Sequence, residues 1–285
     1  DVMPFVGFGF VEVGSITAKA CKGNDKPRLW RLKKSGGLVV NYGLSNEGAD
    51  VISRRLAKRK FAFPLGINIA MTNCKKSSRL KSGIEDYVYS YKKFEGIGDY
   101  LTINISCPNS FGGESFTDPG RLGKLLKEIF KPEKKRPVFV KLACDLSEEK
   151  LDGIISVCER YPVDGFVISN LTKVRDGPLI KDKNVPGMGG ISGVPTRELS
   201  DNSIRYVYKK TRGRYVIIGC GGIFCGRDAY RKIRCGASLV QLFTGMVFMG
   251  PSLISQINQE ICEYLREDGF GSVSEAVGVD AVERG

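Results

Sequence analysis

The chain has 285 residues, 42% of them hydrophobic, and a formal net charge of +13; it can bury a large core in a single domain, residues 1–285, beneath a solvated lysine-rich surface. It contains no histidine, which excludes imidazole bases, Ser-His-Asp triads and most zinc sites, so we expect no metal. Nine cysteines without a C-x-x-C pair argue against a disulfide framework or an iron–sulfur cluster, and no apolar run approaches the roughly 20 residues of a membrane span, so we expect a reducing, cytoplasmic compartment.

Seven short β-rich segments alternate with stretches that are compatible with helices. Near-continuous runs of valine, isoleucine and leucine are typical of parallel strands that are buried on both faces. The alternation predicts the α/β class and, within it, a (β/α)8 TIM barrel. In chain order the predicted strands are 9–14, 64–69, 100–105, 138–142, 165–169, 216–219 and 238–242.

Helix signals agree with this alternation. Ser147, which precedes two glutamates, and Thr196, which precedes Arg197, are typical first residues of helices. The segment 227–234 predicts a helix that stops at Gly236.

The first predicted strand begins only a few residues from Asp1, whereas a closed barrel of this kind needs eight strands. Residues 2–7 look like the tail of a helix or its exit loop. We therefore expect the first barrel strand to lie upstream of Asp1, so that the amino-terminal part of the barrel is incomplete. The segment 21–40 is a basic excursion, and we expect a small hairpin there, near the barrel mouth.

Two amides and a thiol meet at the end of the strand 100–105. Asparagine is depleted in strands, so Asn104 in this apolar segment is expected to offer its amide to a polar ligand. Cys107 and Asn109 follow in the next turn. The alternative interpretation is a buried structural cysteine before a turn, which is the commoner setting for a Cys-Pro pair.

Other strands also end in polar residues. Lys141 closes the strand 138–142, where an inward ammonium needs an anion or a delocalised acceptor as partner. Asn68 and Asn170 lie at the ends of two further strands. Their recurrence on one rim is what a bound planar heteroaromatic ligand requires.

Glycine follows each of the last two predicted strands. Gly221 and Gly222 come after the strand 216–219, and Thr244 with Gly245 comes after the strand 238–242. Phosphate commonly lies at the loops after the last two strands of such barrels, where glycine lets backbone N–H groups approach its oxygens. Glycine after a strand is also an ordinary turn, so this pair alone leaves both interpretations open.

Five segments together resemble the dihydroorotate dehydrogenase family over almost the whole chain. The tail 269–273 (GFGSV) is in addition similar to the quinone-using, membrane-associated branch of that family. The five segments are 10–15 (FVEVGS), 104–109 (NISCPN), 189–193 (GGISG), 219–222 (GCGG) and 236–241 (GASLVQ).

The resemblance implies FMN as the cofactor. Lys141 would face the pyrimidine edge of the flavin and stabilise its reduced, anionic ring, and the upstream strand would carry a further lysine facing the flavin. The residues implied around FMN are Gly14, Ser15, Asn68, Asn104, Lys141, Ser169, Ser192, Gly193, Gly221, Gly222, Phe243 and Thr244.

The implied reaction is the oxidation of dihydroorotate to orotate in pyrimidine biosynthesis, with Cys107 as the base. The segment 110–118 would form a lid, with Gly112 and Gly113 as hinges and Phe111 and Phe116 as cover. The residues implied around the substrate are Asn104, Asn109, Asn170 and the backbone near Gly43 and Leu44.

Quinone is the expected electron acceptor, with peripheral contact to the inner face of a membrane through the upstream region and no nucleic-acid partner. Three residues depart from the family pattern. Cys107 stands where the quinone-using branch normally has serine, Leu171 stands where a substrate-binding threonine is usual, and Val40-Asn41 displaces an expected asparagine. Fumarate or a partner subunit therefore stay open as acceptors, and the sequence does not define the oligomeric state.

Two rival functions also fit parts of the pattern. A tRNA dihydrouridine synthase shares the Asn-x-x-Cys-Pro arrangement and would use the charge of +13 to bind RNA, although Asn109 and the segment 189–193 favour the first interpretation. An aldolase-like barrel would instead use Lys141 to form a Schiff base.

Overall fold

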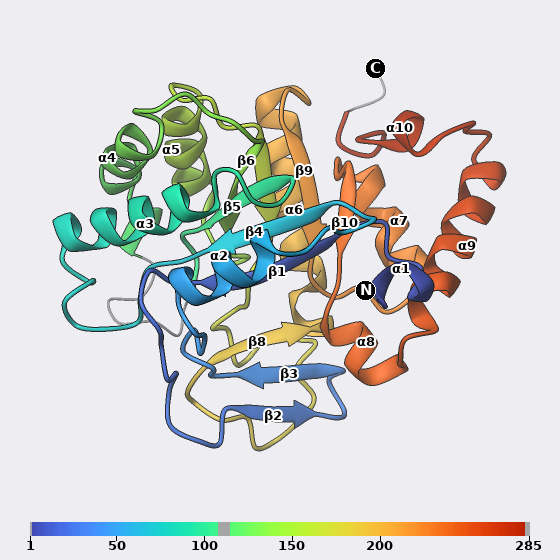
Figure 1. Cartoon of the computed structure of the whole chain (residues 1–285). Helices are drawn as coiled ribbons and strands as arrows, with labels where there is room; N and C mark the ends of the chain where they lie inside the picture. Colours follow the sequence, from blue (N-terminus) through green and yellow to red (C-terminus); the bar gives the residue numbers. More distant parts are fainter. Residues whose placement is uncertain (1, 108–114, 283–285) are drawn as a thin grey trace.

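The computed structural model describes residues 2–107 and 115–282, and its core is a curled, seven-stranded parallel sheet (Figure 1). The strands follow the order β1-β4-β5-β6-β7-β9-β10, and each pairs in parallel with its neighbours. All seven predicted strands are confirmed, and so is the α/β barrel class. Their bounds are β1 Val11–Ile16, β4 Leu65–Ile69, β5 Tyr100–Asn104, β6 Val138–Leu142, β7 Gly165–Ile168, β9 Val216–Cys220 and β10 Leu239–Gln241.

Helices cover the outside of the curled sheet, and from α2 to α7 each packs beside the next along the chain. The predicted helix starts are confirmed, since Ser147 Oγ accepts from Lys150 N at 3.4 Å and Thr196 precedes the first residue of α6. The helices are α1 Met3–Val6, α2 Ala49–Ala57, α3 Leu80–Phe94, α4 Pro119–Ile129, α5 Glu148–Cys158, α6 Arg197–Thr211, α7 Gly226–Arg234, α8 Thr244–Met249, α9 Leu253–Glu267 and α10 Val273–Ala276, with short 3-10 turns η1 Ser115–Thr117 and η2 Val194–Thr196.

The strands are buried on both faces, as their apolar runs predict. Every residue of β4 and β5 is buried, because one face meets the helices and the other meets the barrel interior. Inside the curl, the ring of Tyr100 packs edge-on against Phe139 at 5.4 Å and against Phe10 at 6.3 Å. These aromatic rings form a small cluster with Val167 and Ile218 in the interior of the curl.

A separate antiparallel sheet lies beside the main one, formed by β2 (Leu29–Leu32), β3 (Gly37–Val40) and β8 (Gly190–Gly193). The hairpin expected in the segment 21–40 is confirmed as β2 and β3. Strand β8 was not predicted, because it is short and begins and ends with glycine. It pairs with β3 from Gly37↔Gly193 to Val40↔Gly190 and so brings two distant parts of the chain together.

The first described residues form α1, as the helix-tail interpretation predicts. Gly7 ends this helix with φ +106°. Ser255 and Asn258 of α9 donate to the carbonyl oxygens of Val6 and Gly7 at 3.1 and 2.9 Å, which holds α1 to the body. The sheet order begins at β1 and ends at β10. Among the described residues, no helix is both long and apolar enough to span a membrane.

Close strand packing predicts the effect of one substitution. A Cβ on Gly165 of β7 would lie 1.9 Å from the carbonyl oxygen of Val216 in β9. We expect Gly165→Ala to lower the free energy of unfolding by about 3 kcal/mol, as overpacking does. Gly123→Ala in α4 is the matched control, since its Cβ would meet only Val157 at 3.7 Å, and it should raise stability by up to about 1 kcal/mol. Urea unfolding checks both, and equal stability of the two variants would contradict the packing argument.

Candidate functional site

A cavity of about 410 Å³ lies at the carboxyl ends of the parallel strands, between β1 and β10. One part of its wall is polar and another is apolar and aromatic. Strands β1, β4, β5, β6, β9 and β10 all contribute to it, because parallel strands bring their carboxyl ends to one rim. The lining residues are Met3, Phe8, Phe10, Val11, Glu12, Gly14, Ser15, Asn68, Asn104, Lys141, Asn170, Cys220, Val240, Gln241, Leu242, Phe243 and Met246.

A row of hydrogen bonds runs along the polar wall across three neighbouring strands. Asn104 Nδ2 donates to Ser15 Oγ at 2.8 Å, and Ser15 Oγ donates to Asn68 Oδ1 at 2.5 Å. Asn68 Nδ2 donates to a carboxylate oxygen of Glu12 at 2.8 Å. The predicted residues Ser15, Asn68 and Asn104 are therefore brought together, and Glu12 is the acceptor at the β1 end of the row.

Lys141 lies opposite Asn104 in the register of β5 and β6, and its side chain is 16% exposed. Its Nζ is 3.9 Å from Glu12 Oε1. The inward lysine thus has the anionic partner that its burial requires. An ammonium in the cavity wall can also meet negative charge on a bound ligand.

Glu12 lies in the segment 10–15 that resembles the family, but the sequence alone predicted no role for it. The same rule that singled out Asn104 applies to it, because charged residues are depleted in apolar strands. Gln241, at the end of β10, was missed as well, and its amide donates to Tyr100 Oη at 3.3 Å.

Asn170, an expected substrate residue, lines the cavity and joins the end of the row. Its Nδ2 donates to the Ser106 carbonyl at 2.8 Å, and its Oδ1 accepts from Leu171 N at 2.9 Å. Gly43 and Leu44 do not line this cavity; both adopt positive φ, and the Gly43 carbonyl accepts from Asn73 Nδ2 at 3.0 Å.

Cys107, the expected base, lies three residues after the end of β5 and is partly buried. Its neighbour Ser106 donates through Oγ to Asn104 Oδ1 at 3.1 Å, so this turn is tied to the polar row. The thiol of Cys144 after β6 is a contrasting case: burial, with the charge of Asp145, raises the pKa of Cys144 to about 12.

Most of the expected lid 110–118, including Phe111, Gly112 and Gly113, lies outside the described residues, and so does the expected substrate residue Asn109. Phe116 is described, and it is not among the residues that line the cavity. It is 3% exposed and packs edge-on against Tyr87 with ring centroids 5.3 Å apart. The structure therefore places Phe116 in the hydrophobic core, and its role as lid cover stays a prediction.

A second group of expected cofactor residues gathers where β8, β9 and α8 meet. Ser192 Oγ lies 2.8 Å from Thr244 Oγ1, and a Cβ on Gly193 would fall 2.9 Å from the Thr244 methyl. Only glycine fits at Gly221 and Gly222, which both have positive φ and close neighbours. These residues form a narrow cradle beside the cavity. Ser169, another expected cofactor residue, is buried next to the Cys144 thiol, and its Oγ makes no well-formed hydrogen bond among the described residues.

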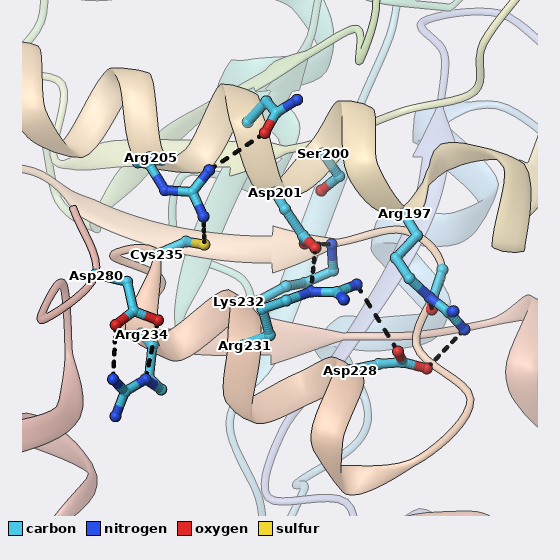
Figure 2. Close-up of polar contacts among 12 residues, drawn as sticks. Arg197, Ser200, Asp201, Arg205, Asp228, Arg231, Lys232, Arg234, Cys235 and Asp280 are labelled. Atoms are coloured by element: carbon cyan, nitrogen blue, oxygen red, sulfur yellow. Dashed lines mark hydrogen bonds and ion pairs between the residues drawn. The ribbon is translucent and has the colours of Figure 1, made fainter.

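Ion pairs between α6 and α7 support this cradle from behind (Figure 2). Arg197 donates through Nε to the Gly222 carbonyl at 2.9 Å and through Nη2 to Asp228 at 2.8 Å. Asp201 accepts from the fully buried Lys232 at 2.6 Å, although burial lowers the pKa of that lysine. The Gly222 carbonyl is thereby held on the helix side of the turn.

A further cavity of about 380 Å³ lies between α2 and α3, and Asp86, Cys74 and Lys19 are among its lining residues. None of the expected site residues lines this cavity. Within the described ranges, no group of three or more cysteine or acidic residues could hold a metal ion.

Three comparisons with known proteins agree. A family model described as dihydroorotate dehydrogenase matches residues 1–265. The chain is 36% identical to the dihydroorotate dehydrogenase (quinone) of Trichodesmium erythraeum over 98% of this chain and 76% of that protein. It is 37% identical to the mitochondrial dihydroorotate dehydrogenase (quinone) of Arabidopsis thaliana over 96% of this chain and 66% of that protein. The ligand-free structure of the dihydroorotate dehydrogenase of Eimeria tenella matches with a TM-score of 0.89 at 31% identity, over 98% of this chain and 83% of that one.

The Arg197 contacts predict a measurable loss of stability. Arg197→Met leaves the Gly222 carbonyl and the buried Asp228 carboxylate each without one partner, so we expect the free energy of unfolding to fall by about 2 kcal/mol. Arg205→Met on the same helix is the control, because Arg205 donates to Asn202 at 3.2 Å and to the Cys235 sulfur at 3.1 Å, away from the Gly222 turn. Denaturant unfolding compares them, and an Arg197 variant no weaker than the Arg205 variant would show that the ion pair does not support the turn.

Proposed function

The chain belongs to the dihydroorotate dehydrogenase family, and from this membership we propose how its residues carry out the oxidation of dihydroorotate to orotate in pyrimidine biosynthesis. The observation that carries the proposal is the cavity itself. Its polar row and Lys141 lie at one side, aromatic and methionine side chains lie at another, and a glycine cradle adjoins it. Family membership also sets aside the RNA-modifying and aldolase interpretations.

The residues present fit FMN, the cofactor of this family. When bound, FMN accepts the hydride that leaves the substrate. Asn68, Asn104 and Lys141 would hold the polar edge of its ring, while Phe243 would contact the apolar part. Gly221, Gly222, Gly193, Ser192 and Thr244 would hold the phosphate, because the cradle has no room for further side chains there. Gly14, Ser15 and Ser169 complete the proposed cofactor residues.

We propose that Cys107 removes the ring proton of dihydroorotate. The chain has no histidine, and the Cys144 thiol, with a pKa of about 12, would stay protonated near neutral pH. An ordinary thiol ionises near about pH 8.5, much closer to neutrality than a serine hydroxyl. Asn104, Asn109 and Asn170, with the backbone near Gly43 and Leu44, are the proposed substrate residues.

Quinone is our proposed electron acceptor, because the similar proteins of Trichodesmium and Arabidopsis are named as quinone enzymes. Quinones dissolve in lipid, so the enzyme must meet a membrane surface to be reoxidised. We propose a cytoplasmic protein with peripheral contact at the inner face of a membrane. A nucleic-acid partner is not part of this proposal.

Flavin absorbance tests cofactor, substrate and acceptor in sequence. Purified protein should carry noncovalent FMN, and dihydroorotate should bleach its absorbance without oxygen because the substrate hydride is transferred. A soluble quinone should then restore the colour, whereas fumarate should not. Protein that binds FMN but keeps its colour with dihydroorotate would refute the substrate, and restoration by fumarate alone would refute the acceptor.

Substitution of Cys107 tests the base. Stopped-flow reduction of FMN by dihydroorotate should slow by roughly 10²- to 10⁴-fold in Cys107→Ala, the usual contribution of a positioned base. In the wild type the rate should rise with pH and level off once the thiol ionises, and Cys107→Ser should shift that rise to higher pH. Cys144→Ala is the matched control and should keep the wild-type pH profile. Reduction of Cys107→Ala at the wild-type rate would rule out this assignment.

A further inference from the structure

Glu12 is a carboxylate inside the barrel, at the foot of the cavity wall. Its side chain is 9% exposed. Asn68 Nδ2 donates to Oε1 at 2.8 Å and Thr102 Oγ1 donates to Oε2 at 2.7 Å, while Lys141 Nζ lies 3.9 Å from Oε1. Three separate strands, β4, β5 and β6, thus direct donors or positive charge at this single side chain.

An ionised carboxylate can only accept hydrogen bonds, so Glu12 determines which way Asn68 faces. The amide of Asn68 must turn its nitrogen toward Glu12 and its oxygen toward Ser15. Ser15 then donates its hydroxyl hydrogen to Asn68 at 2.5 Å, and its oxygen is left to accept from Asn104 Nδ2 at 2.8 Å. Each link of the row depends on the link before it.

The far end of the row has the opposite constraint. The backbone N–H of Ser106 can only donate, and it lies 3.2 Å from Asn104 Oδ1. Asn170 Nδ2 lies 3.4 Å from the same oxygen. The row therefore begins at an obligate acceptor and ends at an obligate donor, and its hydrogen bonds all run in one direction, toward Glu12.

We propose that Glu12 is a positioning residue of the cofactor site, which sets the direction of this row and holds the Lys141 ammonium in the cavity wall. Each amide nitrogen keeps a second hydrogen, so Asn68, Asn104 and Lys141 together offer donors to a ligand edge made of acceptors. Glu12 also places a negative charge beside Lys141 and so limits how strongly the wall attracts electrons onto a bound cofactor. The inference rests on the proposed function, because it takes FMN as the ligand.

Tyr100 gives supporting detail. Burial, together with the negative charge of Glu12, raises the pKa of Tyr100, so this phenol stays protonated beside the carboxylate. Among the described residues that line the cavity, Glu12 is the only aspartate or glutamate. No second carboxylate there competes with it for Lys141.

Two substitutions of Glu12 in the FMN-loaded full chain separate its charge from its hydrogen bonds. Glu12→Gln keeps an acceptor for Asn68 but removes the charge, so the midpoint potential of bound FMN should rise by about 30 mV, a tenfold change for a two-electron couple, while the FMN dissociation constant stays within about threefold. Glu12→Met removes the acceptor too, which frees the Asn68 amide to turn, and FMN should bind about tenfold more weakly. Redox titration and flavin fluorescence measure these values.

Asp152→Asn is the matched control, since Asp152 binds Lys210 at 2.7 Å on the surface and does not line the cavity. It should move neither value. A merely structural role for Glu12 would lower stability without shifting the potential. A Glu12→Gln potential equal to that of the wild type, or a Glu12→Met affinity within twofold of it, would overturn the proposal.

A measurement without FMN keeps the inference separate from the proposed function. Glu12→Gln, Lys141→Met and the double variant form a cycle in denaturant unfolding of the apoprotein. If Glu12 holds Lys141, the folding equilibrium constant of the double variant should differ by about fivefold or more from the value expected if the two single substitutions acted independently. Additive effects would overturn the positioning role. Failure of the wild type to bind FMN would overturn the proposed function, whereas the cycle would still decide on Glu12.

Discussion

A carboxylate and an ammonium inside an apolar barrel are stable only where the surrounding donors and acceptors are paired. Glu12 and Lys141 meet this condition through Asn68 and Thr102, and the row continues through Ser15 to Asn104. The polar side chains of this row are therefore oriented by neighbouring groups of the protein itself. A planar ligand would meet donors that are already oriented. Binding would then cost little of the conformational entropy that ordering these side chains otherwise requires.

The same principle applies at the glycine cradle, but there the backbone is the group that must be oriented. Gly222 can approach its neighbours closely because it lacks a side chain, and for the same reason it cannot anchor itself. Arg197 supplies the anchor by binding the Gly222 carbonyl, and Asp228 holds Arg197 in turn. In both places a charged side chain orients a neutral group, the Asn68 amide in the polar row and the Gly222 carbonyl in the cradle.

Cys107 and Cys144 both follow barrel strands, but they differ in burial. Cys144 follows β6 and is almost completely buried. Burial raises the pKa of its thiol to about 12, so the thiol stays protonated near neutral pH. Cys107 follows β5, is partly exposed, and adjoins Ser106 at the end of the polar row. In a chain without histidine, this difference in exposure is the reason why we propose Cys107, and not Cys144, for proton transfer.

The sequence by itself determined the seven parallel strands, the helix starts and the hairpin in residues 21–40, because apolar runs, capping residues and glycine stops are local signals. It also singled out Asn68, Asn104 and Lys141 as candidate ligand-binding residues, because polar residues are rare in buried strands. The structure places all three in the cavity wall. Only the tertiary structure decided the rest. Strand β8 exists because β3 offers it a partner from far along the chain, and Phe116 joins the core because Tyr87 lies within reach. The role of Glu12 arises from donors on three other strands, and no local pattern records which side chains the closure of a sheet brings face to face.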